Sequence, residues 1–318
     1  MVIMNLLGKG FAREVIAGSI LTFILFLLQR TLPVIGVLAG IAVPFPCVYF
    51  TIQSGRKAGY TIVGFLIIGL YFLGAQEVFI YLLQSVAISL ALPEFLLRGN
   101  GISKSLLYTV AINTLVLVAF VFAYGELLQG DFDGQMRGAL HSAVAQVEEV
   151  YRSMGLTVSD EQKLVTALRE MEKHVGTIYP ALVVIVSWLC AACNLLLLRK
   201  LLRIQEKGAA ICCGSFSRYR NPDGMVWLLI AGGFALLVVE GYVTRITLNA
   251  LIVILFLYFV QGLAVVTYFQ RKLSLSRFLL PVFYFLMLLQ PIMMVPVAAI
   301  GLFDLWADFR TPKQQENL

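Results

Sequence analysis

Charged residues are scarce in this sequence. Asp, Glu, Lys and Arg make up 13% of its 318 residues, about half the share found in a typical soluble domain. Hydrophobic residues make up 60%, and the mean hydropathy is +0.88. A water-facing globule cannot bury so much apolar surface, so most of the chain must have lipid as its solvent. The composition therefore predicts an integral membrane protein.

The sequence also lacks the common signatures of soluble enzymes and metal sites. It has no G-x-x-x-x-G-K-[ST] loop, no H-E-x-x-H and no G-x-S-x-G, and only two histidines and five cysteines. Cys190 and Cys193 form a C-x-x-C within "SWLCAACNLLLL", where thiols pack against neighbouring helices more often than they bind metal. Cys212 and Cys213 are neighbours in a basic loop and cannot comfortably bridge each other. We therefore expect no metal, no cofactor and no enzymatic activity.

The sequence does contain long apolar runs. A bilayer core about 30 Å thick needs about 20 helical residues to cross it, and lipid offers the backbone no hydrogen-bond partners, which requires helices. We predict an all-α, polytopic membrane helix bundle of about eight or nine transmembrane helices with one extramembrane helical hairpin. The candidate spans are residues 14–29, 33–53, 59–74, 76–97, 105–127, 177–198, 225–241, 246–269 and 277–303.

The last apolar run contains Pro281, Pro291 and Pro296, which break or kink helices. It is either one kinked span or two short half-spans. The second case returns the C-terminus to the side of the membrane on which the N-terminus lies.

The net charge of +6 reflects membrane topology rather than nucleic-acid binding. Basic residues gather in alternate short loops, as they do on the cytoplasmic side of membrane proteins. We therefore predict a cytoplasmic N-terminus and the lipid bilayer, not nucleic acid, as the partner of the chain. The loops on that side hold fifteen of the 24 basic residues: Lys9, Arg13, Arg56, Lys57, Arg98, Lys104, Arg199, Lys200, Arg203, Lys207, Arg218, Arg220, Arg271, Lys272 and Arg277.

Residues 128–176 differ from the rest of the chain because they are acidic and amphipathic. Apolar residues recur there at three- and four-residue steps in two segments, which predicts a helical hairpin on the outer side of the membrane. The "SDEQ" of Ser159 to Gln162 has capping-box spacing and predicts the start of the second helix.

We expect a membrane half over 1–127, this hairpin over 128–176, a second membrane half over 177–310 and a polar tail over 311–318. The hairpin is either a lid or partner-binding element, or a solvated pair of helices that bury each other's stripes.

Uncharged amides within the apolar runs are the candidate substrate-binding residues: Asn113, Asn194, Asn249 and Gln261. Polar residues within a membrane are often functional, and amides favour a polar ligand without strong charge. The alternative is that each amide makes an interhelical hydrogen bond, worth about 0.6 kcal/mol on average.

Small residues predict close helix packing at Gly36, Gly40, Gly232 and Gly233.

The last apolar run ends in "GLFDLWADFR", where Asp304, Trp306, Asp308 and Arg310 follow one another closely. The simpler interpretation is a structural cluster at the membrane interface, where aromatic residues are common. Asp304 and Asp308 lie four residues apart and would share a helical face. An intramembrane enzyme that uses both carboxylates is therefore a further hypothesis.

Four stretches in order, "YPALVVIVSWLCAACNLLLLRKLL", "FSRYRNPDGMVWLLIAGG", "TLNALIVILFLYFVQGLAVVTYFQRK" and "AIGLFDLWADFR", resemble the YybS-like family of bacterial membrane proteins. The resemblance covers nearly the whole chain and implies a location in the bacterial cytoplasmic membrane. The residues that look like family signature positions are Asn194, Asn249, Gln261, Gly262, Asp304 and Arg310.

The N-terminal stretch "VPFPCVYFTIQSGRKAGYTIVGFLIIG" more loosely resembles the substrate-binding components of energy-coupling-factor vitamin transporters. The positions that match this outline are Pro44, Pro46, Gly55 and Gly59. This resemblance implies a cytoplasmic ATPase and a membrane coupling subunit as partners.

Two functional hypotheses follow. The first is small-molecule binding or transport, with the amides at the site and the chain acting as a substrate-capture subunit. The second is a membrane scaffold or assembly factor that binds envelope proteins through the 128–176 hairpin.

Overall fold

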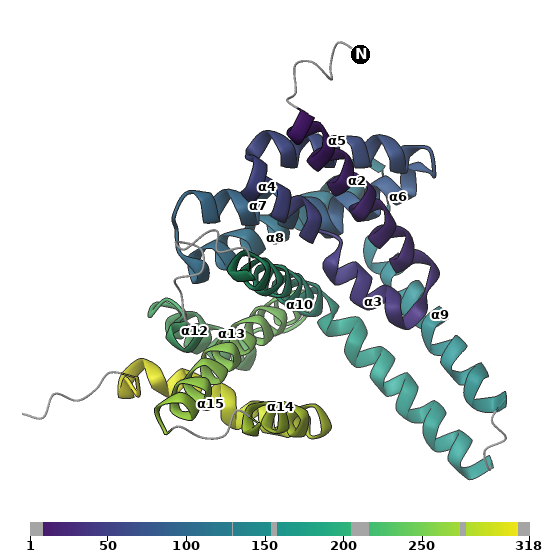
Figure 1. Ribbon diagram of the computed structural model, residues 1–318. Helices are drawn as coiled ribbons and strands as arrows, with labels where there is room; N and C mark the ends of the chain where they lie inside the picture. The colour runs from purple at the N-terminus through teal and green to yellow at the C-terminus, as the bar shows by residue number, and fades with distance from the viewer. Residues whose placement is uncertain (1–8, 129, 154–157, 205–215, 274–277, 311–318) are drawn as a thin grey trace, which may run out of the picture. The chain divides into compact units, whose positions relative to one another are not determined.

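The computed structural model describes residues 9–128, 130–153, 158–204, 216–273 and 278–310, and these residues form helices and no strand (Figure 1). The predicted all-α architecture is therefore confirmed. Helices α12 (Met225–Val238) and α15 (Met294–Ala307) are apolar but shorter than a span. Six described stretches are long and apolar enough to cross a membrane: Gly10–Thr31, Ile35–Ser54, Ala75–Leu97, Ile102–Glu126, Gln162–Leu202 and Tyr242–Lys272.

Prolines divide two of the predicted spans. The run over 33–53 contains α3 (Pro33–Ala42) and α4 (Phe45–Ser54) with a turn between them. The last run contains α14 (Leu279–Leu289), the short 3-10 helix η3 (Pro291–Met293) and then α15. The proline that opens η3 has no N–H with which to continue α14. The run therefore forms two short helices.

The chain divides into two compact units. Unit 1 comprises residues 1–122 and 186–214, and unit 2 comprises residues 123–185 and 215–318. Helix α10 (Val158–Ile204) contributes its first part to unit 2 and its second part to unit 1. This helix therefore belongs to both units.

Unit 1 is built around an apolar core. Helix α2 (Lys9–Thr31) contacts α3, α4 and α5 (Arg56–Tyr71), and α4 also packs against α7 (Ala87–Leu97). The continuous stretch α6 (Ala75–Tyr81), the π-helix η1 (Leu82–Val86) and α7 is followed by α8 (Ile102–Leu128). Core side chains include Phe26, Val43, Cys47, Ile62, Leu66, Leu70 and Tyr81.

Two glycines allow α2 and α3 to approach each other. A Cβ atom on Gly36 would press against the Leu28 and Gln29 carbonyl oxygens, and one on Gly40 would press against the Gln29 side chain. The "GVLAG" segment therefore lies at a close helix contact within unit 1.

Helix α13 (Tyr242–Lys272) is the centre of unit 2, where it contacts α12, α15 and the short helix η2 (Phe216–Arg218). Its closest neighbour is α15, because a Cβ on Gly262 would overlap the Val297 carbonyl oxygen and one on Gly301 would overlap the Tyr258 carbonyl oxygen. The two backbones can touch here only because both positions lack a side chain.

The other predicted packing glycines lie on α12. A Cβ on Gly232 would meet the Leu251 side chain of α13, whereas one on Gly233 would meet nothing within 4 Å. Only the first of the pair therefore lies at a close contact.

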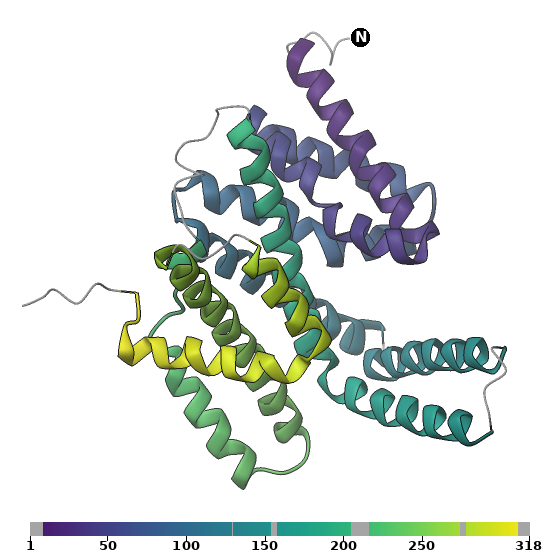
Figure 2. The same ribbon diagram turned by 60° about the horizontal axis from the view of Figure 1, so that its bottom comes forward.

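The predicted hairpin consists of α9 (Phe132–Ser153) and the first part of α10, which lie side by side in Figures 1 and 2. Val144 of α9 is buried, and His141 Nδ1 lies 3.1 Å from Glu172 Oε1. Helix α10 begins at Val158, beside the predicted start, and continues into the next apolar run. Met154 and Gly155 lie outside the described residues.

Candidate functional site

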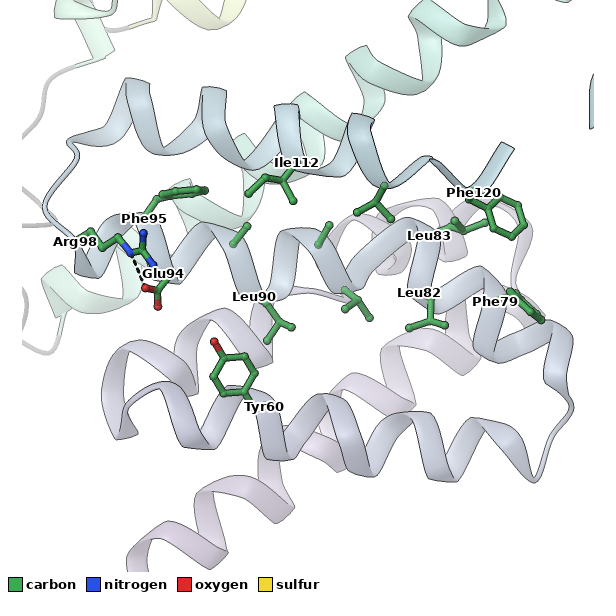
Figure 3. Close-up of a pocket in the computed structure, with 14 residues that line it drawn as sticks. Tyr60, Phe79, Leu82, Leu83, Leu90, Glu94, Phe95, Arg98, Ile112 and Phe120 are labelled. Atoms are coloured by element: carbon green, nitrogen blue, oxygen red, sulfur yellow. Dashed lines mark hydrogen bonds and ion pairs between the residues drawn. The ribbon is translucent and has the colours of Figure 1, made fainter. Parts of the chain in front are cut away.

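A groove with a volume of about 700 Å³ lies in unit 1 between α5, the α6–η1–α7 stretch and α8 (Figure 3). We call it the lateral groove. Most of its lining is apolar, and Glu94 and Arg98 contribute the only charges to that lining. The lining residues are Tyr60, Phe79, Leu82, Leu83, Val86, Ala87, Leu90, Ala91, Glu94, Phe95, Arg98, Ile112, Val116 and Phe120.

The sequence of the lining explains why the groove stays open. Ala87 and Ala91 lie one turn apart on α7, so that one face of this helix carries small side chains opposite Ile112 and Val116 of α8. The lining also includes part of η1, whose π-helical turn departs from the regular α-helix. Single π-helical turns occur frequently at functional sites.

One end of the lateral groove is charged. Glu94 accepts hydrogen bonds from Arg56 Nε at 2.6 Å and from Arg98 Nε at 2.7 Å. The two arginine side chains are 54% and 59% exposed, whereas Glu94 is 20% exposed. Two guanidinium groups on one carboxylate leave this end with a net charge of about +1, since arginine stays protonated.

The other end of the groove is aromatic. The rings of Phe79 and Phe120 lie there with their centroids 6.1 Å apart, and Figure 3 shows them at the end away from Arg98. Phe79 and Arg98 are 19 residues apart in a continuous helical stretch, which corresponds to roughly 28 Å at 1.5 Å per residue.

The opposite face of the same helical stretch is buried and polar. The Ser85 hydroxyl is buried without a hydrogen-bond partner among the described residues. Further along, Cys47 Sγ donates to the Ser89 carbonyl at 3.7 Å. Pro93 lies four residues after Ser89 and has no N–H to donate to that carbonyl, so the thiol compensates for a missing helical hydrogen bond.

Two of the predicted amides lie in unit 1, outside the lining of the groove. Asn113 Nδ2 on α8 donates to Ser187 Oγ at 2.9 Å. Asn194 Nδ2 on α10 donates to the Ile41 carbonyl and to the Cys190 carbonyl, both at 2.7 Å. Both amides are almost fully buried and tie the second part of α10 to other helices of unit 1.

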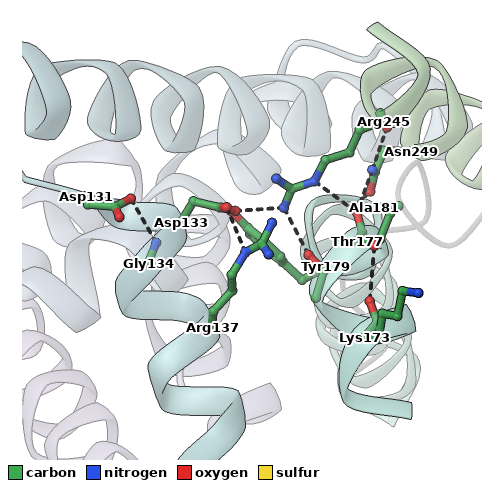
Figure 4. A network of polar contacts seen from close by, with 11 residues as sticks. Asp131, Asp133, Gly134, Arg137, Lys173, Thr177, Tyr179, Ala181, Arg245 and Asn249 are labelled. Carbon is green, nitrogen blue, oxygen red and sulfur yellow. Dashed lines mark hydrogen bonds and ion pairs between the residues drawn. The ribbon is translucent and has the colours of Figure 1, made fainter. Parts of the chain in front are cut away.

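The third amide, Asn249, is hydrogen-bonded to Thr177 and Ala181 of α10, on either side of Pro180 in the sequence (Figure 4). Pro180 has no N–H, so the Gly176 carbonyl loses its usual helical partner. Asn249 Nδ2 donates to the Thr177 carbonyl at 3.0 Å, and its Oδ1 accepts from the Ala181 N–H at 2.8 Å. The side-chain amide therefore satisfies backbone groups at the interruption and joins α13 to α10 within unit 2.

The Gly176 carbonyl accepts instead from Arg245 Nη2 at 3.0 Å, and the same nitrogen donates to Asp133 Oδ1 at 2.7 Å (Figure 4). Tyr179 Oη donates to Asp133 Oδ1 at 3.0 Å, and Arg137 Nε donates to Oδ2 at 2.9 Å. We call these four side chains the Asp133 clamp. The hydrogen bond from Arg245, with those from Tyr179 and Arg137, lowers the pKa of Asp133 to about 2.

The fourth amide, Gln261, belongs to a buried network with Asp304. Gln261 Nε2 donates to Asp304 Oδ2 at 3.0 Å, and Arg310 Nη2 donates to the same oxygen at 2.5 Å. The Asp304 side chain is fully buried and that of Arg310 is 11% exposed. Arg310 Nη1 also donates to the carbonyls of Ser217 at 3.0 Å and Tyr219 at 2.7 Å. This network fixes the end of α15 against α13 and the segment around η2.

Asn221 completes this network and was not among the predicted site residues. Its N–H donates to Gln261 Oε1 at 2.9 Å, and its Nδ2 donates to the Leu257 carbonyl at 2.8 Å. The signal for it is the sequence "NPDG", which is typical of a turn. A turn that must pack onto a helix needs partners for its backbone groups.

The cluster predicted at the end of α15 therefore has an inner and an outer half. Asp304 and Arg310 point inward, whereas Trp306 and Asp308 are exposed. Asp308 is the C-cap of α15 with φ 42°, beyond the last helical residue. The two carboxylates thus lie in different environments, one buried in an ion pair and the other at the surface.

The four amides divide between the two units. Two lie in unit 1 and two in unit 2, and Asn249 and Gln261 are 12 residues apart on α13, roughly 18 Å. Each amide is hydrogen-bonded to a neighbouring element or its backbone, as the structural alternative expects. No group of three potential metal-ligating side chains occurs within the described ranges, and Cys212 and Cys213 lie outside them.

The chain matches the family described as "Predicted membrane protein (DUF2232)" over residues 20–305. It is also similar to the uncharacterized protein YybS of Bacillus subtilis (strain 168), with 24% identity over 306 residues that cover 92% of this chain and 96% of the relative. No solved structure matches it. The resemblance to the YybS-like family is thereby confirmed, and no comparison supports the resemblance to energy-coupling-factor components.

Proposed function

This chain belongs to the DUF2232 family of predicted membrane proteins, and we propose that it binds the hydrocarbon chain of a membrane amphiphile in the lateral groove of unit 1. The observation that carries the proposal is the groove itself, with about 700 Å³ of space, an apolar lining and charge at one end only. Small-molecule sites commonly enclose about 300 to 1,000 Å³ and combine apolar walls with a few polar groups.

The polar contacts favour an amphiphile over the polar ligand expected from the amides. Asn113, Asn194, Asn249 and Gln261 all donate to carbonyl, hydroxyl or carboxylate groups of the protein itself. A polar ligand would have to replace those bonds, whereas a hydrocarbon chain in the groove replaces none. Transport, or capture of a substrate for an ATPase and a coupling subunit, would be a further step after binding.

For the orientation, we place the Arg56–Glu94–Arg98 end of the groove at the cytoplasmic face of the bacterial inner membrane. Both arginines belong to the strongly basic set of short loops, and the positive-inside rule assigns such loops to the cytoplasm. Single cysteines introduced at Lys57 and Lys104 should react with an impermeant thiol reagent only when the cytoplasmic face is open to it. If these cysteines are labelled from the outside of intact cells, the charged end of the groove lies on the outer face and the proposed orientation is wrong.

Blocking the groove tests the proposed function. Ala87→Phe places a large ring on a small lining position, whereas Ala111→Phe places the same ring on an exposed position of α8 outside the lining. A photoreactive lipid with the reactive group on its chain should label wild type and Ala111→Phe on lining residues such as Leu90 and Ile112. Ala87→Phe should lose that labelling with an unchanged helix content. Equal labelling of all three proteins would exclude the groove.

A second function, the membrane scaffold, is favoured by the surface of the hairpin. Val150 and Met171 are about half exposed on it, and the Asp133 clamp fixes the start of α9 to α10 and α13. Contiguous exposed apolar patches mark protein contacts, and we propose that these residues belong to one. If this function holds, Val150→Asp with Met171→Asp should lose co-purifying envelope proteins while lipid labelling stays intact. Retention of those proteins by the variant would argue against it.

A further inference from the structure

We infer that the amphiphile in the lateral groove carries a phosphate head group and a hydrocarbon chain longer than one leaflet of the bilayer. This inference rests on the proposed function and adds the chemical class of the ligand. Two independent features support it, the arrangement of charges at one end and the length of the groove.

The charged end is arranged to receive an anion. Glu94 accepts hydrogen bonds from Nε of Arg98, which belongs to the lining, and from Nε of Arg56, which lies just outside it, and it therefore holds both guanidinium groups at this end of the groove. Each guanidinium has four further N–H donors on its Nη atoms, and both side chains are more than half exposed. Planar guanidinium forks match the oxygens of a phosphate in pairs.

The balance of charge at this end disfavours a cationic head group. The one carboxylate is shared between two arginines, so it offers little attraction to an ammonium group, which the net positive charge repels. Figure 3 places Tyr60 toward the same end of the groove, so the polar groups gather there and the remaining length is apolar. Glu94 acts as a positioning residue for the two arginines.

The length of the groove sets the length of the chain. From Phe79 to Arg98 the helical stretch measures roughly 28 Å, close to the full hydrocarbon thickness of about 30 Å. A lipid chain confined to one leaflet covers about half of that distance. A ligand that fills the groove from the charged end to the Phe79 and Phe120 rings must therefore cross the bilayer midplane.

Thermal stabilisation of the purified full-length protein by four lipids tests this inference. The probes are a long-chain polyprenyl monophosphate, the polyprenyl alcohol of the same length, a short-chain prenyl monophosphate and a diacyl phosphatidylglycerol. The variants are Arg56→Gln with Arg98→Gln, which removes the head-group donors, and Ala87→Phe, which blocks the chain. Arg13→Gln is the control, because Arg13 is an exposed arginine of α2 outside the groove.

We expect the long-chain phosphate to bind most tightly, and the double arginine variant to bind it at least tenfold more weakly, since hydrogen bonds to charged groups are the strong ones. Arg13→Gln should bind like wild type. If the alcohol binds as tightly as the phosphate, or phosphatidylglycerol binds best, the inferred ligand class is wrong although a lipid still occupies the groove. If Ala87→Phe binds every probe like wild type, the proposed function itself fails.

Discussion

The buried ion pair of unit 2 gives the sharpest test of the structure, because one substitution removes its charge without changing its shape. Asp304 is fully buried, and Gln261 and Arg310 both donate to its Oδ2, at 3.0 and 2.5 Å. Asp304→Asn keeps one acceptor oxygen but turns an NH₂ group toward a donor. It also leaves a guanidinium group that is 11% exposed without its counter-charge.

Removing one partner of a buried ion pair typically costs about 3 to 5 kcal/mol, because the remaining charge stays desolvated and unpaired. Arg310 keeps two carbonyl acceptors, those of Ser217 and Tyr219, so we expect a loss near the lower end, about 3 kcal/mol. Replacing both partners with apolar residues, as Asp304→Leu with Arg310→Met, should cost less than Asp304→Asn alone, since no charge is left buried.

The assay is equilibrium unfolding in mixed micelles, followed by circular dichroism, from which the free energy of unfolding is obtained. Asp308→Asn is a matched control, because Asp308 lies four residues away, is 52% exposed and is 3.7 Å from Arg220 in a surface pair. Such pairs contribute about 0 to 1 kcal/mol. If Asp304→Asn unfolds within about 0.5 kcal/mol of wild type, the buried network does not hold α15 to α13 and the reasoning is refuted.

Three further predictions concern single sites. Gly301→Ala should lower the free energy of unfolding by about 1 to 3 kcal/mol, because the new methyl group overlaps the Tyr258 carbonyl, whereas Gly233→Ala, with open space around it, should be neutral or stabilising. Ser85→Ala should not destabilise the protein in the same unfolding assay, since it removes a buried hydroxyl that lacks a described partner; a clear loss would indicate a bound ligand or water. The pKa of Asp133 is lowered to about 2 from 3.8, so its stabilising contribution is complete above about pH 4 and is lost as the pH falls toward 2. In the wild type, amide hydrogen exchange of α9 should accelerate as the pH falls from about 4 toward 2. In Arg245→Gln this pH-dependent acceleration should be absent.

Several features of the fold could be predicted from local sequence. The share of apolar residues and the length of the apolar runs predict membrane helices, and the three- and four-residue periodicity over 128–176 predicts the hairpin that α9 and α10 form. The prolines of the last apolar run indicate a break, and the structure contains α14 and α15 on either side of η3. These properties depend on residues within one or two helical turns of one another.

The lateral groove could not be predicted in this way. Its lining comes from α5, the α6–η1–α7 stretch and α8, and nothing local to Glu94 indicates that Arg56, 38 residues earlier, will share its carboxylate with Arg98. The small residues Ala87 and Ala91 look like ordinary helix-packing positions until the opposite wall is known.

By itself, the sequence determined the solvent of the chain, its helical class and the break in its last apolar run, since hydropathy and backbone geometry act over short distances. Only the tertiary structure decided which polar residues face a partner. Asn249 is hydrogen-bonded to residues on either side of Pro180 and Asp133 to Arg245, across separations of 69 and 112 residues, and Gln261 meets Asp304 across 43. A buried polar group must find a partner or lose free energy, and where that partner lies depends on helix packing, which no local pattern in the chain records.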